Sequence, residues 1–145
     1  MIITGCFLFF SRGLRLRNKL SWFRLSSYQG DKECIEILEG MGARLIKNQE
    51  ESLSIIHGDL NGTIIDASQC PDIIPVLTVV AALSKGETSI INGERLRIKE
   101  CDRLNAICTE LNKLGADIKE LKDGLIINGV KELIGGEVYS HKIIE

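Results

Sequence analysis

No apolar run in this sequence is long enough to span a membrane, and only two of its 145 residues are prolines. Its 18 basic side chains are balanced by 20 acidic ones, so the net charge of −2 gives no indication of a nucleic-acid partner. We therefore expect neither a membrane nor nucleic acid as partner. What remains is an ordinary globular composition, 44% hydrophobic and 26% charged. A chain of this length fits one domain with a sizeable core.

The sequence also lacks the common metal, disulfide and phosphate motifs. It has no Cys-x-x-Cys pair, no histidine at zinc-finger spacing and no glycine-rich loop of Walker or Rossmann type. Its two histidines, His57 and His141, stand alone and are interpreted as turn or surface residues. An odd number of cysteines favours free thiols in a reducing compartment, and we expect a cytoplasmic protein without a metal. The five cysteines are Cys6, Cys34, Cys70, Cys101 and Cys108.

Charge is unevenly distributed along the chain. Residues 1–30 hold five basic side chains and no acidic one, so the rest of the chain carries the negative charge. The apolar residues 1–10 precede the basic ones, which is the reverse of the order in a secretory signal. Two interpretations stay open for this segment: an organellar presequence, or a helix that packs on a neighbour.

Hydrophobic periodicity and turn residues predict three helices and several short strands. Asp31 is placed to cap a first helix, whose apolar face ends at Met41 before Gly42. A second helix, from Pro71 to Leu83, is apolar nearly all round, which predicts central burial. A third helix ends at Gly115. The expected strands are 43–47, 53–57, 63–66, 88–91, 117–121, 125–128 and 137–140.

One order of elements occurs twice in the chain: helix, Gly-Ala, strand, turn, strand, Gly. Residues 35–58 show it first and residues 107–129 show it again, with Gly42 matching Gly115. An internal repeat is a supersecondary unit used twice. Because each unit mixes a helix with short strands, we predict an α/β or α+β fold rather than a helix bundle.

The third helix begins beside a dense cluster of charges. Three basic and two acidic side chains lie between Arg97 and Arg103. If the helix starts early, Lys99 and Arg103 share one face, where like charges repel each other and oppose the helix dipole. An anion held between the cations and the backbone amides removes this conflict. The alternative is a solvated helix start, in which Glu100 and Asp102 neutralise the cations.

A further carboxylate, Asp72, stands at the start of the buried second helix. If the second and third helices are roughly parallel neighbours, Asp72 faces the same opening as Lys99, Glu100 and Arg103. One carboxylate, an acid–base pair and two cations around an anion site suit transfer chemistry on a phosphorylated substrate. The alternative for Asp72 is a first-turn residue that interacts with the helix dipole.

At these residues the sequence resembles the EPSP synthase (3-phosphoshikimate 1-carboxyvinyltransferase) family. Residues 95–103 read Arg-Leu-Arg-Ile-Lys-Glu-Cys-Asp-Arg and resemble its R-x-K-E-S/T-D-R signature, with Cys101 at the usual Ser or Thr. Residues 69–73 resemble its Pro-Asp helix start, and residues 27–31 its S-x-Q-G-D turn. The resemblance covers about residues 26–140. It implies βαβαββ units, about two of them in this chain, with buried parallel helices.

The resemblance also implies roles for individual residues. Asp72 resembles the base that acts on the 5-hydroxyl of shikimate 3-phosphate, and Glu100 the acid that moves a proton at the methylene of phosphoenolpyruvate. Lys99 resembles the lysine that binds shikimate 3-phosphate, and Arg103 an arginine that holds phosphoenolpyruvate. The implied reaction transfers the enolpyruvyl group, releases phosphate and uses no metal or organic cofactor.

Several family motifs are not matched, among them the G-x-K-S-x-S-x-R loop, the S-S-Q motif and the D-H-R motif. We therefore expect a fragment of such a transferase, with an atypical segment at 1–25, a partial domain at 26–145 and no activity by itself. Two other hypotheses stay open. One is a non-catalytic α/β module that binds a phosphorylated ligand or an acidic partner. The other is a structural remnant that associates through exposed apolar surface.

Overall fold

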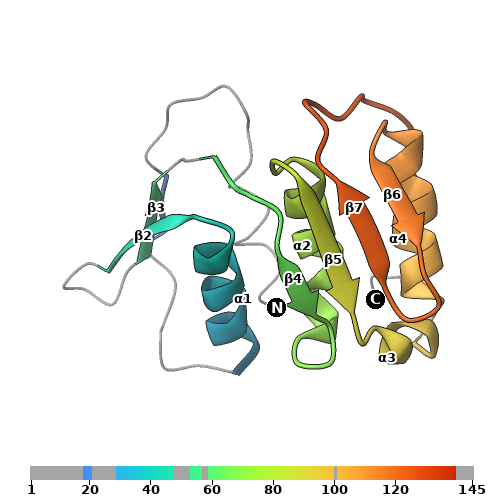
Figure 1. The fold of residues 1–145 in the computed structure, drawn as a ribbon, viewed down its shortest axis with the longest axis horizontal. Helices are drawn as coiled ribbons and strands as arrows, with labels where there is room; N and C mark the ends of the chain where they lie inside the picture. Colours follow the sequence, from blue (N-terminus) through green and yellow to red (C-terminus); the bar gives the residue numbers. More distant parts are fainter. Residues whose placement is uncertain (1–17, 21–28, 48–52, 57–58, 100, 140–145) are drawn as a thin grey trace. The chain divides into compact units, whose positions relative to one another are not determined.

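The computed structural model describes residues 18–20, 29–47, 53–56, 59–99 and 101–139 (Figure 1). The chain forms two compact units, Met1–Leu60 and Asn61–Glu145. No helix among these described residues is long and apolar enough to cross a membrane. The expected division into residues 1–25 and 26–145 stays a prediction.

The first unit contains one helix and a three-stranded antiparallel sheet. Its elements are β1 (Asn18–Leu20), α1 (Gln29–Gly40), β2 (Arg44–Lys47) and β3 (Leu53–Ile56), with the strand order β1-β3-β2. The apolar face expected for the helix is confirmed, because Cys34, Leu38 and Met41 are buried. Strand β1 was not expected. Its three residues are too few and too polar to show an alternating pattern, and they are strand only because they pair with β3.

The second unit is one complete βαβαββ unit with an additional helical turn. It comprises β4 (Ile64–Asp66), a 3₁₀ turn (Pro71–Ile73), α2 (Ile74–Ala82), β5 (Glu87–Ile91), α3 (Glu94–Arg97), α4 (Arg103–Lys113), β6 (Asp117–Glu120) and β7 (Leu125–Asn128). The strand order is β4-β5-β7-β6. Strands β4 and β5 are parallel, whereas the other pairs are antiparallel.

The core of this unit lies between one face of the sheet and the helices. In Figure 1, α2 lies behind the sheet beside β5, and α4 packs along β6. Strand register puts six buried side chains on the covered face because alternate residues point to the same side. Helix α2 is buried on nearly all sides, as its apolar sequence predicted. The six side chains are Ile65, Thr88, Ile90, Ile118, Leu125 and Ile127.

The two helix–strand–strand segments share the same helix ending. Gly42 has a φ of 98° and Gly115 a φ of 85°, a conformation that glycine adopts without a steric penalty. The following residue then donates back to the helix, from Ala43 N to Leu38 O and from Ala116 N to Leu111 O. Both endings are Schellman motifs. The repeat seen in the sequence therefore corresponds to a repeated structure in α1-β2-β3 and α4-β6-β7.

Two expectations about elements were wrong. Residues 137–139 form no strand, because the segment bonds to α4 instead: Ile134 N donates to Leu114 O, and Tyr139 N donates to the Glu110 carboxylate. The second helix does not begin directly at Pro71. A 3₁₀ turn comes first, so Asp72 lies in this turn, ahead of α2.

The sheet offers a test of this core with two matched isoleucines. Ile90 on β5 is fully buried, whereas Ile64 on the neighbouring strand is 71% exposed. We expect Ile90→Ala to lower the free energy of unfolding by about 2–5 kcal/mol, since it leaves a cavity in the core. Ile64→Ala serves as the control and is expected to cost less than about 0.5 kcal/mol. Urea denaturation followed by circular dichroism measures both, and equal losses would contradict this core.

Candidate functional site

The candidate site lies at one edge of the second unit's sheet. Because β4 and β5 run in the same direction, the loops that follow them leave from the same edge. The first loop leads to Asp72 and α2, and the second leads through α3 to Lys99 and α4. The two helices contact each other, and Asp72, just before α2, lies 3.2 Å from Arg103 at the start of α4, so the helix starts are neighbours. This arrangement confirms the expectation that the two helix starts lie close together.

A hydrogen-bonded carboxylate connects the two loops. Asp66, the last residue of β4, accepts a bond from Ser68 N at 2.9 Å and from Asn92 Nδ2 at 3.0 Å. Asn92 follows β5 and has a φ of 57°, a left-handed conformation that asparagine tolerates better than most residues. The bonds from Ser68, and then from Asn92, lower the pKa of Asp66 below its ordinary value of 3.8. Asp66 therefore fixes the loop before Asp72 relative to the loop before Lys99.

Asp72, Lys99 and Arg103 lie together, as the sequence predicted. Asp72 Oδ1 is 3.2 Å from Arg103 Nη1 and 3.6 Å from Lys99 Nζ. The carboxylate is 69% exposed, Lys99 is 35% exposed and Arg103 only 10%. One accessible carboxylate thus faces two cations that come from a different loop. Glu100, the fourth expected residue, lies outside the described residues.

The repulsion expected between Lys99 and Arg103 on one helix face does not occur. Helix α4 begins at Arg103, and Lys99 lies ahead of it, so these two residues are not one turn apart on a helix. Asp102 is the N-cap, and its side chain accepts a hydrogen bond from Asn105 N at 3.1 Å. In the alternative, Glu100 and Asp102 neutralise the cations; the other oxygen of Asp102 bonds Arg97 at 2.7 Å, and Glu100 lies outside the described residues. Asp72 lies beside both cations.

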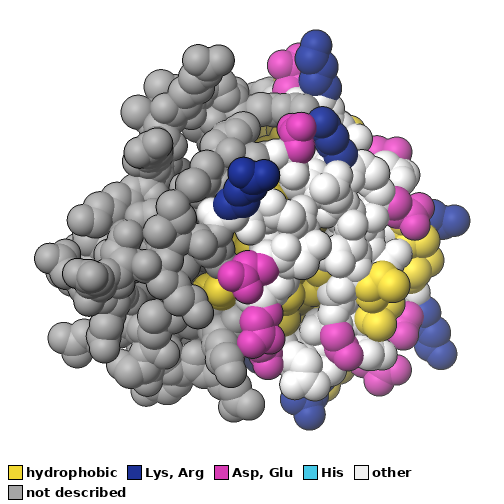
Figure 2. All heavy atoms as spheres, turned by 60° about the vertical axis from the view of Figure 1, so that its left-hand side comes forward, with side chains coloured by type: hydrophobic (Ala, Val, Ile, Leu, Met, Phe, Trp, Pro, Cys, Tyr) yellow, Lys and Arg dark blue, Asp and Glu magenta, His cyan; other side chains and the backbone are white. Residues whose placement is uncertain are grey.

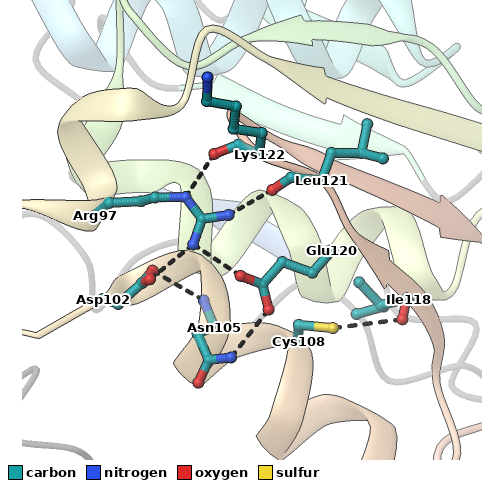
Figure 3. Close-up of polar contacts among 8 residues, drawn as sticks. All are labelled: Arg97, Asp102, Asn105, Cys108, Ile118, Glu120, Leu121 and Lys122. Atoms are coloured by element: carbon teal, nitrogen blue, oxygen red, sulfur yellow. Dashed lines mark hydrogen bonds and ion pairs between the residues drawn. The ribbon is translucent and has the colours of Figure 1, made fainter.

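Sequence reasoning did not identify the polar cluster around Arg97, shown in Figure 3. Arg97 donates to Asp102 and Glu120, each at 2.7 Å, and to the carbonyl oxygens of Leu121 and Lys122. These acceptors lie at the start of α4 and at the end of β6, so only the fold brings them together. The sequence offered one signal for this cluster: Asp102 stands where a helix N-cap is expected, which predicts that its side chain turns back to the start of the helix.

Four of the described cysteines form no disulfide. They are Cys34, Cys70, Cys101 and Cys108. Burial raises the pKa of the Cys108 thiol, whose sulfur lies 3.4 Å from the Ile118 carbonyl oxygen. A raised pKa keeps this thiol protonated and poorly nucleophilic.

Comparison with known proteins establishes the family. The family model described as EPSP synthase (3-phosphoshikimate 1-carboxyvinyltransferase) matches residues 19–142. The chain belongs to the EPSP synthase family. The resemblance seen in residues 69–73 and 95–103 is therefore confirmed.

The similar proteins are much longer than this chain. A 3-phosphoshikimate 1-carboxyvinyltransferase of Clostridium perfringens is 98% identical over 118 residues, which cover 81% of this chain and 28% of that protein. One from Clostridium beijerinckii is 56% identical over 139 residues, covering 95% of this chain and 32% of that protein. The chain thus spans about 28% of the length of the first of these relatives.

Solved structures confirm the predicted fold class. An EPSP synthase from Acinetobacter baumannii superimposes with a TM-score of 0.64 at 33% identity, over 75% of this chain and 29% of that one. An enolpyruvyl transferase from Streptomyces tendae, at 18% identity and a TM-score of 0.58, shares the fold over 72% of this chain and 26% of that one. The βαβαββ unit is therefore that of the enolpyruvyl transferases.

The Asp66 link predicts a pH dependence for this EPSP synthase family chain. Since folding lowers the pKa of Asp66, its stabilising effect is complete above 3.8 and is lost as the pH falls through the lower folded-state pKa. We expect Asp66→Asn to be less stable than the wild type above about pH 5, with the difference shrinking toward pH 2. Urea midpoints from pH 2 to 6 measure this. Asp123→Asn, which makes the same change at an exposed carboxylate, is the control. If the urea midpoints of Asp66→Asn and the wild type change in parallel with pH, the stabilising role of Asp66 is contradicted.

Proposed function

We propose that this chain supplies part of the site where an enolpyruvyl group moves from phosphoenolpyruvate to the 5-hydroxyl of shikimate 3-phosphate. The observation that carries the proposal is the convergence of Asp72 with Lys99 and Arg103 at the starts of neighbouring helices. These residues come from two separate family motifs. The free thiols of the described cysteines suit the reducing cytoplasm, where we place this function.

The two cations are suited to bind anionic substrates. Lys99 and Arg103, both beside the exposed Asp72 carboxylate, offer two cationic donors to a phosphate or carboxylate. Arg103, only 10% exposed, has little hydration to lose, and its planar guanidinium matches a carboxylate with two parallel hydrogen bonds. We assign Arg103 to phosphoenolpyruvate and Lys99, a compact point charge, to shikimate 3-phosphate.

The attraction for an anion is local rather than a property of the whole surface. On the face shown in Figure 2, basic and acidic side chains of the described residues are interspersed, in line with the net charge of −2. Charges of both signs partly cancel at long range. Salt also screens exposed charges over about 10 Å, so the field far from the surface is weak. Affinity for an anion then depends on the few cations that touch it, here Lys99 and Arg103.

Asp72 is suited to act as the general base. Its carboxylate is 69% exposed and its 3.6 Å ion pair with Lys99 is exchangeable, since exposed ion pairs contribute only about 0–1 kcal/mol. A substrate anion that takes over Lys99 and Arg103 leaves the carboxylate available to accept the proton of a hydroxyl. Glu100, outside the described residues, is assigned the proton transfers at the methylene carbon. It delivers a proton there as the new oxygen–carbon bond forms, and it removes a proton from the same carbon as phosphate leaves and the enolpyruvyl double bond is restored.

This chain contains only part of the groups that enclose the substrates. Since it spans about 28% of the length of the Clostridium perfringens relative, we expect it to bind shikimate 3-phosphate weakly and to show no turnover by itself. Appreciable turnover by the purified chain of 145 residues would contradict this assignment.

Binding by the isolated chain tests the cations. We expect Lys99→Ala to weaken the binding of shikimate 3-phosphate about tenfold, and Arg103→Ala to weaken the binding of phosphoenolpyruvate about tenfold, in each case the effect of losing one charge-assisted hydrogen bond. Titration followed by heteronuclear NMR measures the dissociation constants. Lys119→Ala, which removes an equal charge from an exposed position on β6, is the control and should bind as the wild type does.

The same titration with glucose 6-phosphate separates this function from a general anion-binding module. Equal, weak binding of both phosphates would favour the module. If either alanine variant unfolds while the other variant still binds normally, the cluster has a structural role instead. Light scattering on the same samples reports any self-association.

The base role is tested in a full-length enzyme. In the Clostridium perfringens relative, we expect the change equivalent to Asp72→Asn to lower kcat by about 10²–10⁴-fold, since the amide cannot accept the proton. The KM values should change much less, because the amide keeps the shape of the side chain. Steady-state kinetics with both substrates measures each constant. An effect confined to KM would show that Asp72 binds substrate without acting as the base.

A further inference from the structure

Arg97 belongs to the same charged cluster as Lys99 and Arg103, yet its carboxylate partners are Asp102 and Glu120, whereas theirs is Asp72. Its guanidinium makes four hydrogen bonds, all to protein groups (Figure 3). Nε donates to Lys122 O at 2.6 Å, Nη2 donates to Leu121 O, and Nη1 donates to both Asp102 and Glu120. The side chain is 26% exposed. Arg97 is thus engaged with the β6–β7 turn and with the start of α4.

The bonds of Arg97 link the two ends of the α3–α4 connection, the segment that leads to the site cations. Arg97 is the last residue of α3, and Asp102 is the N-cap of α4. The 2.7 Å ion pair between them therefore joins the two ends of the connection in which Lys99 lies. Arg103 follows the cap directly. Lys99 is therefore two residues from Arg97, and Arg103 is one residue from Asp102. Arg97 holds both of these ends in place.

A second set of bonds makes the arrangement rigid. The Oδ1 atom of Asp102 caps α4 through Asn105 N, while its Oδ2 atom accepts from Arg97. Glu120 in turn accepts from Arg97 with one oxygen and from Asn105 Nδ2 with the other, at 3.0 Å. Each carboxylate is bonded by both Arg97 and Asn105. Because the two carboxylates share these donors, the start of α4 cannot shift relative to β6 without breaking several of the bonds.

We propose that Arg97 is a positioning residue: it sets where Lys99 and Arg103 lie relative to Asp72, without touching substrate itself. This inference rests on the function proposed above. Lysine cannot replace Arg97 in this role, since an ammonium group lacks the planar fork that reaches two carbonyl oxygens and two carboxylates at once. The hydrogen bond to Glu120, together with Asp102, raises the pKa of Arg97, so the guanidinium stays charged at every working pH.

The test compares Arg97→Lys with the wild-type chain by two readouts. The first is the Nε–Hε resonance of Arg103, which reports the surroundings of this side chain without any ligand. The second is the dissociation constant for shikimate 3-phosphate. We expect a clear shift of the Arg103 resonance and binding about tenfold weaker, in a chain that stays folded but has a lower urea midpoint because several hydrogen bonds are lost. Arg44→Lys, the same change at an exposed arginine of the first unit, is the control and should alter neither readout.

The outcomes separate this inference from the proposed function. An unchanged Arg103 resonance in a folded Arg97→Lys chain would overturn the positioning role, whatever the affinity. If the wild type does not bind shikimate 3-phosphate, the proposed function fails, while the resonance still decides the role of Arg97. Should Arg97→Lys fail to fold, Glu120→Gln provides a milder change, because it removes one ionic partner and keeps a hydrogen-bond acceptor. It is expected to shift the same resonance by a smaller amount.

Discussion

The parallel pairing of β4 with β5 is the constraint on which the second unit depends. Parallel strands require a crossover, and α2 supplies it while burying its apolar surface against the sheet. The same pairing sends both following loops out at one edge, where α2 and α4 begin. Asp66 then ties these loops together through Ser68 and Asn92. Hydrophobic burial thus places the loops, and a few polar bonds adjust them, so that residues far apart in the sequence meet at the edge.

Charged residues that are neighbours in the sequence have different tasks in the fold. Arg97 makes four hydrogen bonds, two of them to backbone carbonyl oxygens that have fixed positions. Lys99 and Arg103 instead face the exposed carboxylate of Asp72, at 3.6 and 3.2 Å. The pair with Lys99, which is 35% exposed, is of the kind that contributes little and exchanges easily for a ligand. The cluster therefore combines a rigid support with a replaceable carboxylate, an arrangement suited to a site that must hold and then release anions.

Much of this fold was predictable because its signals are local. The helix endings at Gly42 and Gly115, the buried α2 and the strands β4 to β7 each follow from patterns within about ten residues. The missed elements depend on distant partners. Strand β1 exists through pairing with β3, and residues 137–139 are not strand because they bond to α4. A strand needs a neighbour to complete its hydrogen bonds, and a short segment does not encode which neighbour that is.

The residues of the site could be read from the sequence: a carboxylate at the Pro71–Asp72 helix start, and the basic and acidic residues from Arg97 to Arg103 in a recognisable family order. How these residues are grouped depends on the fold. It put Asp72 beside Lys99 and Arg103, and it directed Arg97 and Asp102 to each other and to Glu120. The physical reason is that charge interactions depend on distance and burial. Residues two positions apart in a loop face different partners once the sheet and helices fix the backbone.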